Sequence, residues 1–478
     1  MPFARHTHAF SAFVALPVTL ALAGCGGGDG DDGDVAAIPR APDVTVRETA
    51  PPPVPPQVAV HVLDGDSGKP VRGARVVVSG ETATSASTGV ARVTEPTHRR
   101  FRIVVTARGY ERRSERVTLR RDQAYVRIWR TATQWPMYGA TPARTQVQPA
   151  ITLRPPFKRI WHRKLHGLIE FPAVVWQGVA YVNNFHGWLR AIDVRTGHVL
   201  WQRRIGSLIA ASPAIDPKRN ILVTTTMQPG YVYAISLANG KVKWRYYSGM
   251  AEPSPVIRDG VAYFGTTRGN VFALDLDRRK PRWAFHGGVK ITSSPALVGN
   301  RLFFGDYAGR VFALDVRNGR VVWRGSAGSR VYGTVAVSHG RVFAPSVFSG
   351  LSALSARTGR LLWRIPVGVY LYSSPAVFRG RVYFGTYAGL VYSADARTGR
   401  ILWSRSAGGA VSGAVQIVNG VVYAGSMGSR ITAWSWRGGK QLWTFPHGRY
   451  VPVSGNGSVL LMHGGGAIWG VVPKRHKR

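Results

Sequence analysis

The chain has 478 residues, 45% of them hydrophobic, and its 63 Lys and Arg against 23 Asp and Glu give a net charge of +40. That length is too great for one ordinary domain unless the chain is a repeat array, and the 56 Gly and 15 Trp residues favour a turn-rich all-β protein over a helical one. The single cysteine, Cys25, excludes an intrachain disulfide, so packing alone must hold the fold.

The N-terminal stretch "MPFARHTHAFSAFVALPVTLALAGC" has the layout of a secretory signal peptide. Arg5 precedes an apolar run over 9–23, which is short for a membrane-spanning helix. The final "LAGC" resembles the lipobox of bacterial lipoproteins, which implies removal of 1–24 and attachment of lipid to Cys25. A plain signal peptide with a chance cysteine is the alternative.

The next segment, 25–56, is predicted to be a disordered tether. "GGGDGDDGD" has no residues that could build a core, and "PPPVPP" favours extended polyproline conformation. Such a spacer would hold a folded part away from a membrane, so the predicted location is extracytoplasmic and membrane-anchored.

Residues 57–130 alternate apolar and polar side chains in stretches such as "VAVHV", "ARVVV" and "RFRIVV", which predicts short β-strands. "DGDSGKPVRGARVVVSG" and "FRIVVTARGYERRSERVTL" resemble the carboxypeptidase-regulatory-like, transthyretin-type β-sandwich. The resemblance implies an accessory module without catalytic residues.

From residue 131 to 478 one phrase recurs, as in AIDVRTGHVLW, ALDVRNGRVVW and SADARTGRILW, at steps of 39–43 residues. A unit of about 40 residues with four short strands is one blade of a β-propeller. The Asp is placed to accept hydrogen bonds from the turn, the Gly supplies a positive φ, and the Trp offers a flat surface between neighbouring blades. The predicted blade-docking tryptophans are Trp161, Trp201, Trp244, Trp283, Trp323, Trp363, Trp403 and Trp443.

These repeats resemble the PQQ-like, tryptophan-docked eight-bladed propellers, a family that includes quinoprotein dehydrogenases and BamB-like envelope lipoproteins. Three strands follow Trp443, and "FKRIWHRKL" (157–165) can supply their fourth strand, so that both ends of the chain close the eighth blade. The predicted fold is therefore all-β, an eight-bladed propeller preceded by a small sandwich.

A PQQ dehydrogenase requires a carboxylate base and acidic or amide ligands for a divalent cation. Carboxylates are scarce after Arg130, and apart from those in turns only Glu170, Glu252 and Asp306 remain, in different repeats. The histidines show no metal-ligand spacing. We therefore predict no enzyme activity, with no catalytic, cofactor-binding or metal-binding residue, and keep a PQQ-dependent dehydrogenase as the remote alternative.

The loops before the innermost strands carry residues that tend to line or rim the central channel in this family. Plugging or solvating the channel is the simpler role for them, and a small-ligand site is the alternative. These candidate channel-rim residues are Glu170, Glu252, Lys290, Arg330, Tyr332, Tyr370, Tyr372 and Tyr450.

The basic charge concentrates on the repeats, and many arginines fall in the repeat turns, so a charged ring could attract anionic lipid or wall polymers. A basic composition shared by the whole proteome is the alternative. We predict a monomeric, non-enzymatic envelope lipoprotein that acts as a protein-interaction scaffold, with a binder of anionic polymers or a small ligand as the second interpretation. The turn arginines are Arg317, Arg320, Arg357, Arg360, Arg397 and Arg400.

Overall fold

The structure is a computed structural model that describes residues 55–474. The predicted signal peptide, Cys25 and nearly all of the predicted tether lie outside these residues. The described part is all-β, as the sequence predicted, with one short 3-10 helix, η1 (Thr131–Thr133).

Two small sheets come first along the chain, and they share one hydrophobic core. In strand β1 alternate residues are buried, which follows from the two-residue period of a strand with one face on a core. The first sheet contains β4 (Val90–Thr94), β1 (Gln57–Asp64) and β7 (Gln123–Ile128), and the second contains β3 (Glu81–Thr84), β2 (Arg75–Val78), β5 (Arg100–Thr106) and β6 (Arg113–Thr118).

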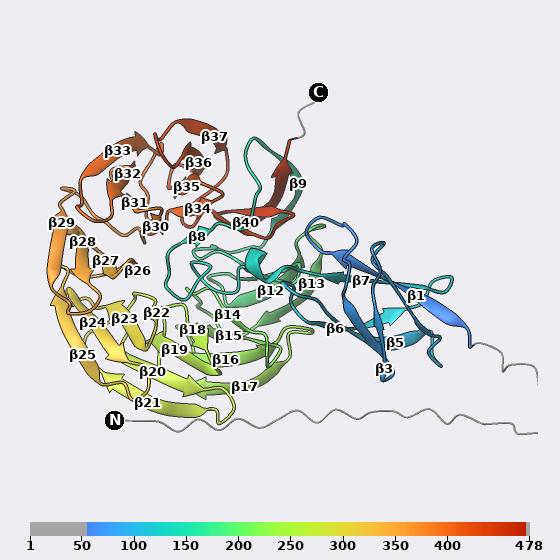
Figure 1. Cartoon of the computed structure of the whole chain (residues 1–478). Helices are drawn as coiled ribbons and strands as arrows, with labels where there is room; N and C mark the ends of the chain where they lie inside the picture. The colour runs from blue at the N-terminus through green and yellow to red at the C-terminus, as the bar shows by residue number, and fades with distance from the viewer. Residues whose placement is uncertain (1–54, 475–478) are drawn as a thin grey trace, which may run out of the picture. The chain divides into compact units, whose positions relative to one another are not determined.

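Repeated antiparallel sheets of four strands follow, arranged in a ring with the first strand of each sheet innermost (Figure 1). This arrangement fits a β-propeller. The first three sheets are β10 (Val174–Trp176), β11 (Val179–Asn183), β12 (Trp188–Asp193) and β13 (Val199–Arg204); β14 (Ala214–Asp216), β15 (Ile221–Thr225), β16 (Tyr231–Ser236) and β17 (Val242–Tyr247); β18 (Val256–Arg258), β19 (Val261–Gly265), β20 (Asn270–Asp275) and β21 (Lys280–His286).

The next three sheets repeat the same order. They are β22 (Ala296–Val298), β23 (Arg301–Gly305), β24 (Arg310–Asp315) and β25 (Val321–Ser326); β26 (Ala336–Ser338), β27 (Arg341–Ser346), β28 (Gly350–Ser355) and β29 (Leu361–Ile365); β30 (Ala376–Phe378), β31 (Arg381–Gly385), β32 (Leu390–Asp395) and β33 (Ile401–Ser406).

The last two sheets draw on strands from both ends of the repeat region. In one, β8 (Val147–Gln148) joins β34 (Gln416–Val418), β35 (Val421–Ser426), β36 (Arg430–Ser435) and β37 (Gln441–Phe445); in the other, β9 (Phe157–Lys164) joins β38 (Val453–Gly455), β39 (Leu460–Gly464) and β40 (Ala467–Pro473). The predicted pairing of 157–165 with the C-terminal strands is confirmed, because β9 is antiparallel to β40. Strand β10 lies beside β38, so the first and last of these sheets are neighbours.

The repeat turns work as the sequence predicted. Asp193 Oδ1 accepts the backbone N–H groups of Arg195 and Thr196 at 3.0 and 2.9 Å, and Asp395 does the same in its turn. Hydrogen bonds link the loops just before neighbouring innermost strands, where a backbone N–H group of one sheet donates to a Ser or Thr hydroxyl group of the next at 2.9–3.3 Å. The pairs are Ser212–Ser254, Ser254–Ser294, Ser294–Thr334 and Thr334–Ser374.

Candidate functional site

One hollow lies where the loops before the innermost strands meet, and we call it the channel mouth. Tyr138 and Phe171 line its floor, a cavity of about 40 Å³. Five of the predicted channel-rim residues line the same cavity: Glu170, Glu252, Tyr332, Tyr372 and Tyr450.

Two carboxyl groups make the floor of the channel mouth polar. The Nζ atom of Lys290 lies 3.7 Å from Oε2 of Glu252, which is 9% exposed. Burial raises the pKa of Glu252, and the charge of Lys290 and a hydrogen bond from Tyr332 act against that increase. Burial and the charge of Glu252 together raise the pKa of Glu170 to about 7. The floor therefore offers hydrogen-bond acceptors beside ammonium and phenol donors.

The other predicted residues, Lys290, Arg330 and Tyr370, lie on the rim around this cavity. The ammonium of Lys290 is 5.0 Å from the ring centroid of Tyr307, and the guanidinium of Arg330 is 5.5 Å from the same ring. Arg330 also lies 5.4 Å from the ring of Phe348, which meets Tyr370 edge to face at 5.4 Å. Cations and rings thus hold one another in place.

Sequence reasoning missed the aromatic residues that a second set of loops adds to this rim. Tyr307, Phe348 and Tyr387 come from the loops between the second and third strands of three successive sheets. The signal was present in "DYAG", "VFSG" and "TYAG", which recur at the repeat spacing. We call the whole group the rim cluster: Lys290, Tyr307, Arg330, Phe348, Tyr370 and Tyr387.

A segment before β9, residues 134–148, contacts the innermost strands of most sheets, and sequence reasoning missed this too. Trp135 and Val175 exchange two backbone hydrogen bonds of 2.9 and 2.8 Å. Further backbone N–H groups donate to carbonyls of the segment: Ile215 to Pro136, Leu297 to Pro142, Val337 to Ala143, Val377 to Thr145 and Ile417 to Gln146. The segment closes the centre of the ring, and we call it the plug.

Arg144 anchors the plug in the centre of the ring, where it is completely buried. Its Nε donates to the carbonyl of Pro295 at 3.0 Å, and its Nη2 donates to the carbonyls of Ser254 and Pro255 at 2.9 Å. A further bond reaches the carbonyl of Tyr138. Burial lowers the pKa of Arg144 to about 9, because removal from water disfavours the charged form of the side chain.

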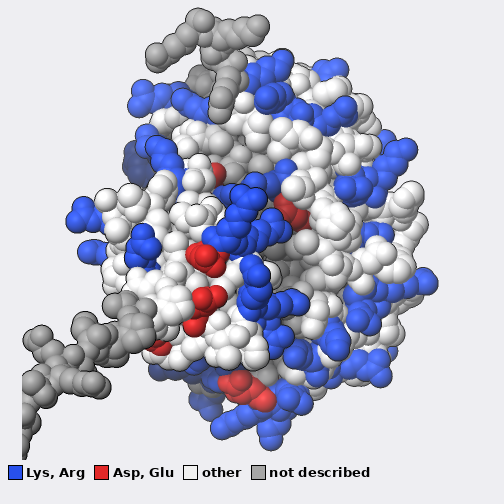
Figure 2. All heavy atoms as spheres, turned by 90° about the vertical axis from the view of Figure 1, so that its right-hand side faces the viewer, with Lys and Arg blue, Asp and Glu red and all other residues white. Residues whose placement is uncertain are grey.

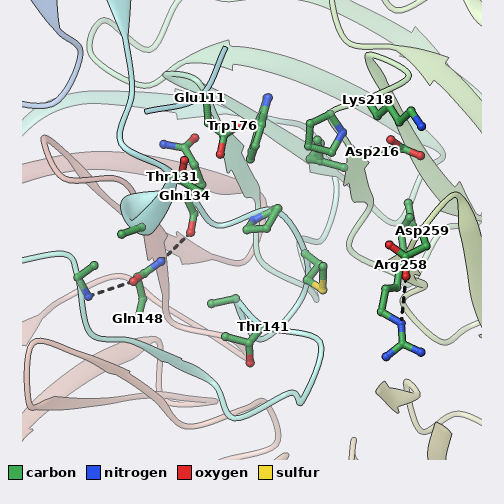
Figure 3. A pocket seen from close by; sticks show the side chains of 18 of the residues that line it. Glu111, Thr131, Gln134, Thr141, Gln148, Trp176, Asp216, Lys218, Arg258 and Asp259 are labelled. Atoms are coloured by element: carbon green, nitrogen blue, oxygen red, sulfur yellow. Dashed lines mark hydrogen bonds and ion pairs between the residues drawn. The ribbon is translucent and has the colours of Figure 1, made fainter. Parts of the chain in front are cut away.

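A second hollow lies at the opposite end of the innermost strands, beside the plug, and measures about 790 Å³. Its apolar floor includes Met137, Trp176 and Ile257. Figure 3 shows Glu111 and Trp176 on one side, with the charged residues Asp216, Lys218, Arg258 and Asp259 across from them.

Hydrogen bonds fix parts of this plug-side cleft. Gln148 Nε2 donates to the carbonyl of Gln134 at 2.6 Å, and Gln148 Oε1 accepts the N–H of Ala150 at 3.1 Å. Burial raises the pKa of Glu111, and a hydrogen bond from Thr131 acts against that increase.

The repeat tryptophans contact the following sheet. The ring of Trp323 lies against Gly359 in the next repeat turn, where a Cβ atom would overlap it, and the φ of +75° at Gly359 also favours glycine. Trp443 instead packs against Phe157 of β9, at 5.1 Å between ring centroids. Five indole N–H groups donate to a backbone carbonyl of the following sheet at 2.8–3.3 Å: Trp161 to Val194, Trp201 to Leu237, Trp283 to Val316, Trp323 to Ala356 and Trp403 to Trp436.

Besides Trp443, two repeat tryptophans depart from this pattern. Within residues 55–474, the indole N–H of Trp363 is buried without a hydrogen-bond partner, although its ring still contacts Gly399. The turn that follows Trp244 in the sequence carries Arg279, at a φ of 59°, in the place of the glycine. The role of all these rings in docking remains a prediction.

The remaining acidic candidate, Asp306, belongs to a turn. Its Oδ1 accepts the N–H groups of Ala308 and Arg310 at 3.0 Å, and Oδ2 accepts Arg310 Nε at 2.6 Å. Asp306 does not join Glu170 and Glu252 in the cavity. Residues 55–474 contain no cluster of three or more His, Cys, Asp or Glu arranged to hold a metal ion.

Lys and Arg side chains are spread over the face of the molecule seen in Figure 2, with few carboxylates among them. Of the turn arginines, Arg317 is paired, with Nη2 2.5 Å from Oδ2 of Asp315, and this contact helps to lower the pKa of Asp315 to about 2.

No helix within the described part of the chain is long and apolar enough to cross a membrane.

The family model described as outer membrane protein assembly factor BamB matches residues 127–284, 278–369 and 347–470. The chain belongs to this family. The crystal structure of BamB from Moraxella catarrhalis superimposes on this BamB-family chain with a TM-score of 0.56 at 17% identity, covering 67% of this chain and 99% of that one. A europium-containing methanol dehydrogenase gives a TM-score of 0.61 at 12% identity, covering 71% of this chain and 98% of that one. Both likenesses concern the fold.

One curated relative of this BamB-family chain is the lanthanide-dependent methanol dehydrogenase of Methylacidiphilum fumariolicum (strain SolV). It is 27% identical over 123 residues, which are 25% of this chain and 20% of that protein. The match thus spans about a fifth of the relative's length.

Proposed function

We propose that this BamB-family chain is a non-enzymatic lipoprotein of the cell envelope, anchored through Cys25 and acting as a protein-interaction scaffold. In this proposal the repeated sheets form the eight blades of a closed, monomeric propeller. The two small N-terminal sheets form a carboxypeptidase-regulatory-like accessory sandwich. Membership of the BamB family supports the scaffold role and the extracytoplasmic location.

The filled centre of the ring carries the proposal. The cavity beside Glu170 and Glu252 measures about 40 Å³, whereas pockets for small molecules and cofactors are typically about 300–1,000 Å³. A tricyclic quinone does not fit there, and the plug closes the channel below. Asp306, the third carboxylate a quinone site might use, is bound in its own turn.

The similarity to methanol dehydrogenases supports the alternative of a quinone-dependent dehydrogenase. Reconstitution separates the two functions. Purified protein mixed with PQQ and either calcium or a lanthanide should show no alcohol-dependent or sugar-dependent dye reduction and no stoichiometric quinone binding. The matched variant Glu170→Gln, Glu252→Gln should behave like the wild type. Turnover that these two substitutions abolish would overturn the scaffold proposal.

The basic surface supports a second candidate function, the binding of anionic envelope polymers. Anionic vesicles should then bind with an affinity that falls steeply with salt, because the Debye length shortens from about 10 Å at 0.1 M to about 3 Å at 1 M. The test variant changes five exposed turn arginines to Gln: Arg320, Arg357, Arg360, Arg397 and Arg400. Its control changes five exposed arginines of the N-terminal sheets: Arg72, Arg75, Arg99, Arg102 and Arg116. Equal losses of affinity in the two variants would mean that binding depends on the total charge alone.

A further inference from the structure

The channel mouth exposes three aromatic rings close together. Phe348 is 59% exposed, Tyr370 is 46% exposed and Tyr387 is 44% exposed. All three belong to the rim cluster and lie around one opening, where Tyr370 meets Tyr387 at 6.1 Å and Phe348 at 5.4 Å between ring centroids. Contiguous exposed apolar surface of this kind marks a binding site more often than a chance arrangement.

Contacts with neighbouring rings and cations support the arrangement of the aromatic side chains at the mouth. Tyr372 meets Tyr332 at 5.2 Å and Tyr387 at 5.6 Å, both edge to face. Tyr307 lies under two cations, Lys290 and Arg330. A preorganised site avoids part of the entropy cost of ordering side chains on binding.

Below the rings, the mouth presents hydrogen-bonding groups of both kinds. The carboxyl oxygens of Glu170 and Glu252 accept hydrogen bonds, while Lys290 and the phenol groups donate them. A ligand for this mouth needs donors for the carboxylates, acceptors for the cations and a ring-sized apolar face for the exposed aromatic residues.

Several ligand classes fail one of these conditions. The Lys290 and Arg330 charges repel a cationic ligand and already occupy faces of the Tyr307 ring. The Glu170 and Glu252 carboxyls at the floor disfavour the phosphodiester backbone of a single-stranded nucleic acid, although stacking and cations at the rim would attract it. A folded protein surface cannot present groups to the narrow floor.

A saccharide meets all three conditions, because each hydroxyl group both donates and accepts and because the C–H face of a pyranose packs on an aromatic ring. We propose that the channel mouth binds the end of a glycan chain. Its sugar rings lie against Phe348, Tyr370 and Tyr387, and its hydroxyl groups bond to Glu252 and Lys290. This inference rests on the proposed function, since it assigns a ligand to a binding platform that has no quinone.

The test is calorimetric titration of the full-length protein with two probes: tetra-N-acetylchitotetraose, which is neutral, and tetragalacturonate, which is acidic. At least one should bind, and the double variant Tyr370→Ala, Tyr387→Ala should weaken its affinity tenfold or more. Glu252→Gln should also weaken binding while leaving the thermal midpoint unchanged or higher. Tyr247→Ala, at a tyrosine that is 63% exposed on β17, is the matched control and should change nothing.

Failure of both probes to bind overturns the inference, as does binding that survives the Tyr370 and Tyr387 substitutions. Binding of an eight-nucleotide thymidine strand at this mouth, with neither sugar bound, would replace the saccharide with a nucleic acid. Sugar-dependent dye reduction with PQQ is a different result, because it would overturn the proposed non-enzymatic function. The two failures are therefore distinguishable.

Discussion

Trp323 offers the sharpest test of how neighbouring sheets are held together. Its side chain is 7% exposed on β25 and packs against Gly359 of the next sheet, with Phe303 5.9 Å away between ring centroids. Its indole N–H donates to the carbonyl of Ala356 at 3.0 Å. Trp323→Ala removes the ring, the hydrogen bond and the wedge between two sheets at once.

The expected loss is about 3–5 kcal/mol of the free energy of unfolding, as for other large buried aromatic residues truncated to alanine. The hydrogen bond accounts for about 1 kcal/mol of it. Its loss does not leave the Ala356 carbonyl without a partner, because Arg301 Nη1 also donates to that oxygen at 2.7 Å. Trp323→Phe keeps most of the ring area and should therefore cost only about 1–2 kcal/mol.

Trp363→Phe is the matched control, because the Trp363 ring occupies the same place in the next repeat. Its N–H is buried without a partner among residues 55–474, so its removal also removes an unsatisfied donor. It should cost about 1 kcal/mol less than Trp323→Phe. Urea or guanidinium denaturation measures each loss, read from the midpoint at an unchanged slope. A loss below 1 kcal/mol for Trp323→Ala would refute docking by the repeat tryptophans.

Three further substitutions test other parts of the molecule. Cys25→Ser should move the protein from the membrane to the soluble fraction, and mass spectrometry of the N-terminus should show no lipid. Glu170→Gln should raise the free energy of unfolding at pH 8 by roughly 1–3 kcal/mol. In the folded wild type the pKa of Glu170 is raised from 4.5 to about 7. Folding therefore favours the protonated carboxyl group, and the wild type loses stability as the pH rises from 4.5 to about 7. Denaturation at pH 5 and at pH 8 measures this loss of stability, which should be absent from the Glu170→Gln variant. Arg144→Leu should cost about 3–5 kcal/mol, because the buried carbonyls of Tyr138, Ser254, Pro255 and Pro295 lose their hydrogen-bond donor. A thermal midpoint within 2 °C of the wild type would contradict this.

The repeat could be predicted because its signals are local. The Asp of each turn bonds to backbone groups two and three residues away, and the tryptophan recurs at nearly constant steps. The closing strand was predictable by elimination, since three C-terminal strands without an outer partner left 157–165 to complete the sheet. Such features depend on short sequence separations or on repeat counting, and both are visible in one chain.

The plug was not predictable for the opposite reason. Arg144 bonds to carbonyls 110, 111 and 151 residues away, and no local pattern in "GATPARTQVQ" indicates a buried cation. The fold of residues 134–148 follows from the inner strands around it, because its backbone bonds go to them. In the sequence, nothing distinguishes Arg144 from the many arginines expected on the surface of this chain.

The channel mouth shows how a repeat protein acquires an individual function. In each repeat a buried aliphatic residue, such as Ile291 or Val331, fixes the loop before the innermost strand, so the backbone is constrained while the next side chain is not. Those next positions hold Glu170, Ala210, Glu252, Thr292, Tyr332, Tyr372 and Ser412, whereas the docking position is Trp in every repeat. Packing between equivalent neighbouring sheets requires the same residue in every repeat, whereas a single opening at the centre does not require its lining residues to be alike. Chemical variety is therefore found at the centre, and substitutions of its uncharged side chains should change binding with little effect on folding.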